Sequence, residues 1–90
     1  MQEIHVIVSG VVQGVSYRYY VQDAATELSV TGWVQNLPDG TVEVLAQADG
    51  DTLKEFIEYL HEGSLHAKVE GVAAEWRTPK REFDDFTIRY

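Results

Sequence analysis

The chain has 90 residues, 44% of them hydrophobic, a formal net charge of −8 and no cysteine. This length predicts a single domain over residues 1–90. The negative charge argues against nucleic acids and anionic membranes as partners, because both favour basic surfaces. The absence of cysteine excludes disulfides and thiolate metal sites. No signal peptide precedes the first predicted strand and no apolar run approaches about 18 residues, so we expect a soluble cytoplasmic protein.

The first predicted element is a strand, which a glycine-containing loop connects to a helix. Ile4, Val6 and Val8 recur at every second position, which is typical of a strand with one apolar face. The loop Gly10–Tyr17 follows, and apolar residues recur at helical spacing from Arg18 onward. Such a junction points several backbone N–H groups at one place, where the helix dipole adds positive potential. Arg18 adds a planar fork of donors that fits phosphate oxygens, so the junction is predicted to hold an anion.

The middle of the chain predicts a β-hairpin. The two expected strands cover Gly32–Asn36 and Thr41–Ala48. In the turn between them, Pro38 fixes its own φ and Gly40 permits a positive φ. This turn sets the register of the hairpin and leaves Asn36 at the end of its strand.

A second helix is predicted after the hairpin. Thr52 and Glu55 have the spacing of a capping box, and Asp49 and Asp51 are alternative caps. Apolar residues then recur at helical spacing until Gly63, which suits the position after a helix end.

Two further strands complete the predicted order β-α-β-β-α-β plus one short strand. They cover Val69–Trp76 and Phe86–Tyr90, with a polar connection over 78–84. Right-handed crossovers place both helices on one face of an antiparallel sheet. The expected fold is therefore α+β, a ferredoxin-like two-layer sandwich in which the first and third strands are central and the second lies beside the third. In this arrangement Arg18 and Asn36 reach the same edge of the sheet and face one small site.

Two motifs and the last strand resemble the acylphosphatase family over essentially the whole chain. The matching segments are Gly10-x-Val12-Gln13-Gly14-Val15-x-Tyr17-Arg18, Gly32-Trp33-Val34-Gln35-Asn36-x-x-x-Gly40-x-Val42 and Phe86-x-Ile88-x-Tyr90. Two positions depart from the family pattern. Tyr17 stands where the family usually has Phe, which adds a hydroxyl beside the loop, and Ala48 stands where it usually has Gly. We interpret Ala48 as a small inward residue, and a required positive φ would instead make it strained.

The resemblance implies hydrolysis of small acyl phosphates to a carboxylate and inorganic phosphate by a monomer, with no cofactor and no metal. The implied catalytic residues are Arg18, which grips the phosphate, and Asn36, which orients the attacking water. The substrate's own phosphate is expected to accept the proton. The implied phosphate-binding loop consists of Val12, Gln13, Gly14, Val15, Ser16, Tyr17 and Arg18.

The same residues admit other interpretations. Gly10 and Gly14 alone would indicate only a tight turn, and Asn36 also suits a turn. A non-catalytic anion-binding module of the same fold is the main alternative, although binding alone does not need Asn36. A regulatory or RNA-binding domain is disfavoured by the negative charge. The three histidines lack the spacing of metal ligands on one face, and we expect them on a strand surface or in loops.

Overall fold

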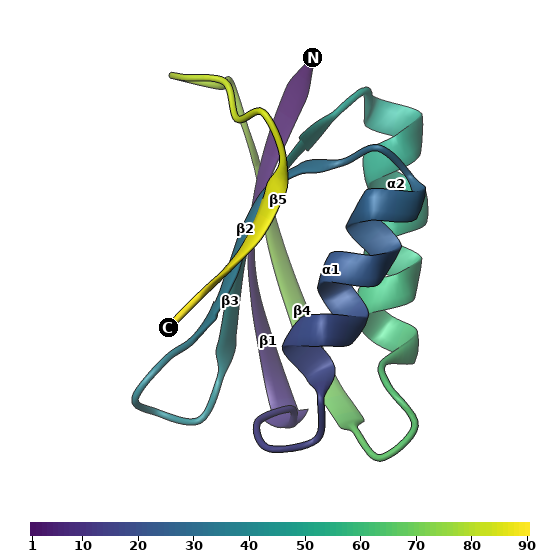
Figure 1. The fold of residues 1–90 in the computed structure, drawn as a ribbon, viewed down its shortest axis with the longest axis vertical. Helices are drawn as coiled ribbons and strands as arrows, with labels where there is room; N and C mark the ends of the chain where they lie inside the picture. The colour runs from purple at the N-terminus through teal and green to yellow at the C-terminus, as the bar shows by residue number, and fades with distance from the viewer.

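The computed structural model describes residues 1–90 and shows a five-stranded sheet with both helices on one face (Figure 1). The strand order is β4-β1-β3-β2-β5, so the predicted ferredoxin-like order is confirmed, with β1 and β3 central and β2 beside β3. Neither helix is long and apolar enough to cross a membrane. The elements are β1 (Gln2–Val11), α1 (Tyr17–Glu27), β2 (Thr31–Asn36), β3 (Val42–Ala48), α2 (Gly50–Glu62), β4 (Lys68–Arg77) and β5 (Phe86–Arg89).

The fifth strand makes the sheet mixed. The pairs β1/β3, β1/β4 and β2/β3 are antiparallel as expected, whereas β5 pairs with β2 in parallel. The connection after β4 crosses one end of the sheet and enters the far edge beside β2 (Figure 1). As a result, β5 runs toward the end of the sheet that carries the loop between β1 and α1.

The core lies between the sheet and the two helices. Alternate residues of the two central strands point to the helices, which is the period-two pattern of a half-buried sheet. Burying a side chain such as Phe56 or Leu60 contributes about 1.5–3 kcal/mol. The fully buried residues of this layer include Ile4, Val6, Val8, Val42, Val44, Ala46, Leu53, Phe56 and Leu60.

The helix starts differ in how they are capped. Asp49 caps α2, because its carboxylate accepts hydrogen bonds from the Thr52 backbone N–H at 2.9 Å and the Thr52 hydroxyl at 3.0 Å. These bonds lower the pKa of Asp49. Asp49, one of the two alternative caps expected from the sequence, is therefore the cap of α2, and Thr52 and Glu55 do not form the capping box. Helix α1 begins at Tyr17, after Ser16 in a left-handed conformation that makes no side-chain capping bond.

Both departures from the family pattern are accommodated by packing. The Tyr17 hydroxyl donates a hydrogen bond to the carbonyl of Leu60 at 2.8 Å, and the buried side chain has a raised pKa because burial disfavours its ionised form. The hydroxyl therefore lies between the helices and not beside the loop, where we expected it. Ala48 has no positive φ and packs against the core, in agreement with a small inward residue.

Candidate active site

The loop between β1 and α1, the β2–β3 turn and the C-terminus lie at one end of the sheet (Figure 1). A cavity of about 230 Å³ opens between them. The cavity brings together the two residues that the sequence places at one edge of the sheet, both of them half-buried. Its lining residues are Val12, Gly14, Ser16, Arg18, Tyr19 and Asn36.

Free backbone donors form one wall of the cavity. The N–H groups from Val12 to Ser16 donate no hydrogen bond within the chain. The first turn of α1 adds N–H groups without intrahelical partners, as at any helix start. Gly14 and Ser16 turn the loop through left-handed conformations, with φ of 73° and 61°. Because α1 has no acidic residue in its first turn, the positive end of its dipole is not neutralised there. This wall is suited to an anion.

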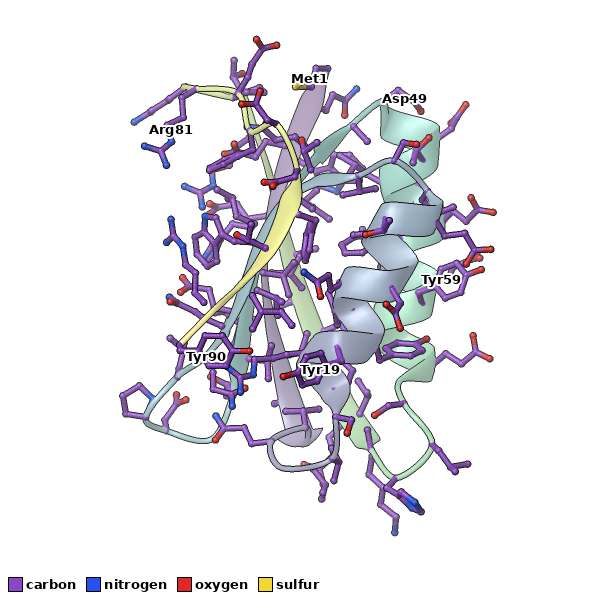
Figure 2. The ribbon with its side chains drawn as sticks, in the orientation of Figure 1. Met1, Tyr19, Asp49, Tyr59, Arg81 and Tyr90 are labelled. Atoms are coloured by element: carbon purple, nitrogen blue, oxygen red, sulfur yellow. The ribbon has the colours of Figure 1, made fainter.

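Arg18 is held by the last residues of the chain. Its guanidinium donates a hydrogen bond to the carbonyl of Arg89 at 3.0 Å and lies 4.8 Å from the centre of the Tyr90 ring. The hydroxyls of Tyr19 and Tyr90 are 3.3 Å apart, and this hydrogen bond raises the pKa of Tyr90 (Figure 2). No carboxylate forms an ion pair with Arg18. Its charge is therefore oriented by a carbonyl and a ring but remains uncompensated by any acid.

Asn36 presents an unsatisfied acceptor. Its side-chain oxygen is buried and accepts no hydrogen bond from the protein. Buried amide oxygens almost always have a partner, because an unmet acceptor costs about 1–3 kcal/mol. The residue lies on the same face of β2 as the buried Val34, at the strand end that borders the cavity. The oxygen is thus available to a donor that enters the cavity.

The loop is tied to its surroundings by two side chains. The Gln13 amide donates to the carbonyls of Leu37 and Thr41, at 2.8 Å and 2.9 Å, and so joins the loop to the β2–β3 turn. The Ser64 hydroxyl donates to the carbonyl of Val15 at 3.0 Å. Sequence reasoning missed these ties and the contact of Arg18 with the chain end, because each joins residues distant in sequence. For the contact of Arg18 with the chain end, the only indication in the sequence was the resemblance of the last strand to the family pattern.

The histidines do not contribute to this cavity. His5 lies on the opposite face of the sheet, where its ring and the Glu43 carboxylate are 2.7 Å apart. That hydrogen bond lowers the pKa of Glu43. His61 is in the last turn of α2, and His66 is in the loop that follows. No three His, Asp or Glu side chains gather into a group that could hold a metal ion.

Comparison with known proteins identifies the family of this chain. The sequence model of the acylphosphatase family matches residues 4–88. An acylphosphatase of Marinobacter nauticus is 49% identical over 82 residues, which cover 91% of this chain and 89% of that protein. The crystal structure of acylphosphatase from Bacillus subtilis is 37% identical, with a TM-score of 0.97 and full coverage of both chains. An acylphosphatase structure from Coxiella burnetii is 42% identical, with a TM-score of 0.92 and coverage of 97% and 90%. The chain thus belongs to the acylphosphatase family, hydrolases that act on acyl phosphates.

Proposed function

We propose that this acylphosphatase hydrolyses the carboxyl-phosphate bond of small acyl phosphates in the cavity between the 12–18 loop and Asn36. The products are a carboxylate and inorganic phosphate. One observation carries the proposal. Free N–H donors, the Arg18 side chain without an ion pair and the unsatisfied amide oxygen of Asn36 all lie around one cavity. We also propose that the protein acts as a single-domain monomer and that it is located in the cytoplasm.

The phosphoryl group is bound by the backbone and by Arg18. The N–H groups of the 12–18 loop hold the non-bridging oxygens, and Arg18 adds a fixed positive charge. The molecule carries a net charge of −8, so its overall field repels an anionic substrate. Binding therefore depends on these local donors. For the same reason, an Arg18 side chain without an ion pair favours binding, because its full positive charge is available to the substrate.

The attacking water is positioned by Asn36. The amide oxygen accepts a hydrogen bond from the water and directs the water's oxygen at phosphorus, in line with the leaving carboxylate. The new P–O bond forms as the bond between phosphorus and the acyl oxygen breaks, and the carboxylate leaves with that electron pair. An amide does not ionise near neutral pH, so the water's proton passes to a phosphate oxygen of the substrate itself. The carboxylate is a good leaving group and needs no general acid.

The roles are tested with Arg18→Ala and Asn36→Ala, and phosphate release from a small acyl phosphate is measured. Each loss should lower kcat/KM by about 10²–10³-fold, the usual effect of removing one preorganised polar group. Gln35→Ala is the matched control for the amide, because Gln35 precedes Asn36 and bonds to Glu43 on the opposite face. Full activity of Asn36→Ala would refute the water-positioning role.

Thermal protection by inorganic phosphate separates catalysis from binding. Asn36→Ala should keep the phosphate-induced rise in Tm, because the loop donors and Arg18 remain. Arg18→Ala should lose most of it. If the unaltered protein is protected by phosphate but releases none from acyl phosphates, the alternative holds and the chain is a non-catalytic anion-binding module.

A further inference from the structure

The open face of the sheet, away from the helices, carries a second cavity of about 310 Å³. It lies between the strands and the segment that follows β4. Figure 2 shows Arg81 of that segment on the side of the sheet opposite the helices. The cavity shares no lining residue with the candidate active site. Its volume is at the lower end of the range for small-molecule pockets.

A buried polar network builds the wall of this open-face cavity. The side chain of Gln47, only 1% exposed, donates to the carbonyl of Arg81 at 2.6 Å and accepts from the N–H of Phe83 at 3.3 Å. The same amide donates to the buried carboxylate of Glu3 at 2.8 Å. These bonds fix the segment after β4 against the sheet. The cavity is therefore held open by buried hydrogen bonds and is not a gap between loosely placed surface side chains.

The apolar lining of the cavity is largely aromatic. It consists of Trp33, Leu45 and Phe83. Trp33 and Leu45 are register partners on adjacent strands, so their side chains lie side by side on the open face. The guanidinium of Arg89 lies over the Trp33 ring, 4.3 Å from its centre, and the guanidinium of Arg81 lies over the Phe83 ring, 4.9 Å from its centre. The cavity thus combines aromatic rings with guanidinium groups, a lining that suits a planar ring with a negative charge.

The charges around this lining are unequally compensated. The carboxylate of Glu43 is bound by His5 at 2.7 Å and by Gln35 at 2.6 Å. The other lining carboxylate, Glu3, is bound by the Gln47 amide and lies 4.0 Å from a guanidinium nitrogen of β4. By contrast, Lys80 and Arg81 form no ion pair, in a chain with 15 acidic and only seven basic residues. The apolar part of the lining is therefore bordered by two cations that have no carboxylate partner.

We propose that the open-face cavity binds an aromatic carboxylate, with its ring on Trp33, Leu45 and Phe83 and its carboxylate toward Lys80 and Arg81. Charge-assisted hydrogen bonds from the two cations would compensate the single negative charge. The carboxylates of Glu3 and Glu43, which also line the cavity, oppose polyanions such as nucleotides. The proposal goes beyond the hydrolytic function and does not depend on it.

The test is a titration of the ¹⁵N-labelled protein with 2-naphthoate, followed by NMR in saturating inorganic phosphate, which occupies the candidate active site. Saturable shifts should centre on Trp33, Leu45 and Phe83. The double substitution Lys80→Ala/Arg81→Ala should weaken binding about tenfold or more, because hydrogen bonds to charged groups are lost. The matched control is Lys54→Ala/Lys68→Ala, which changes the net charge equally and should keep the affinity. The neutral isostere 2-naphthylmethanol should bind about tenfold more weakly.

The outcomes that overturn the proposal are distinct. One is the absence of saturable shifts at millimolar naphthoate, and another is a set of shifts centred on residues 12–19. Equal affinity of the Lys80→Ala/Arg81→Ala variant, or of the neutral isostere, would show that the cations do not recognise the carboxylate. Shifts that depend on protein concentration without ligand would identify a second copy of the chain as the occupant.

Discussion

Gln13 offers the sharpest test of how the two halves of the candidate site are held together. Its amide donates to the carbonyls of Leu37 and Thr41, on either side of the turn that follows Asn36. The loop proposed to supply the phosphate donors is thereby fixed relative to Asn36, the residue proposed to position the water. We predict that Gln13→Ala lowers kcat while it largely preserves phosphate binding, because the N–H groups and Arg18 are unchanged.

The magnitude follows from the two bonds that are lost. Both are short, at 2.8 Å and 2.9 Å, and each contributes about 0.5–1.5 kcal/mol. The free energy of unfolding should therefore fall by about 1–3 kcal/mol, which leaves the protein folded if its stability is typical, about 5–15 kcal/mol. A displacement of about 1 Å between reacting groups can reduce a rate by about 10²-fold, so we expect kcat to fall by about 10–10²-fold.

The assay combines urea unfolding with steady-state hydrolysis of a small acyl phosphate. Gln22→Ala is the matched control, because the Gln22 amide also donates to a backbone carbonyl, that of Phe86 at 3.1 Å, but away from the cavity. It should lose about 1 kcal/mol of stability and keep its kcat. If Gln13→Ala is destabilised as expected yet turns over at the unaltered rate, the tie is structural only and the reasoning is wrong.

Three other predictions concern the fold. Tyr17→Phe should lower the free energy of unfolding by about 0.5–1.5 kcal/mol in urea melts and leave kcat unchanged, because its hydroxyl bonds to the far helix. Gly10→Ala should give no native circular dichroism spectrum, since the new Cβ would lie 2.1 Å from a β4 carbonyl, whereas Gly14→Ala meets nothing within 4 Å and should cost about 1–2 kcal/mol. The hydrogen bond from His5 lowers the folded-state pKa of Glu43, so near its ordinary value of 4.5 the folded state binds fewer protons than the unfolded state. This contribution is present above that value and lost as pH falls through the folded pKa, so the difference in stability between the unaltered protein and Glu43→Gln should shrink from about pH 6 to about pH 3.

Local patterns were sufficient to predict the order of the first four strands and the two helices, and to place Arg18 and Asn36 at one edge of the sheet. The alternation of Ile4, Val6 and Val8 identifies the central strand, and the turn chemistry at Pro38 sets the hairpin. Right-handed crossovers then leave few topologies. These rules act over short stretches or on whole elements, and they bring the two site residues to the same end of the sheet without any knowledge of side-chain contacts.

The contacts that orient the site were beyond such patterns. The bonds of Gln13 span 24 and 28 residues, and the bond from Arg18 to Arg89 spans 71. A four-residue strand such as β5 is too short for its periodicity to indicate its neighbour. Its parallel pairing with β2 brings Tyr90 against Arg18, and that placement follows only from the assembled sheet.

The distribution of charge explains why these distant contacts matter for catalysis. A net charge of −8 repels an acyl phosphate at long range, so the proposed binding relies on attraction within a few ångströms of Arg18 and the free N–H groups. Salt screens the long-range repulsion over about 10 Å but weakens partly buried hydrogen bonds far less. Moderate ionic strength should thus favour substrate association rather than oppose it. The proposed catalysis therefore depends on the rigidity of the 12–18 loop, which Gln13 and Ser64 tie to its surroundings, and on the chain end, which orients Arg18.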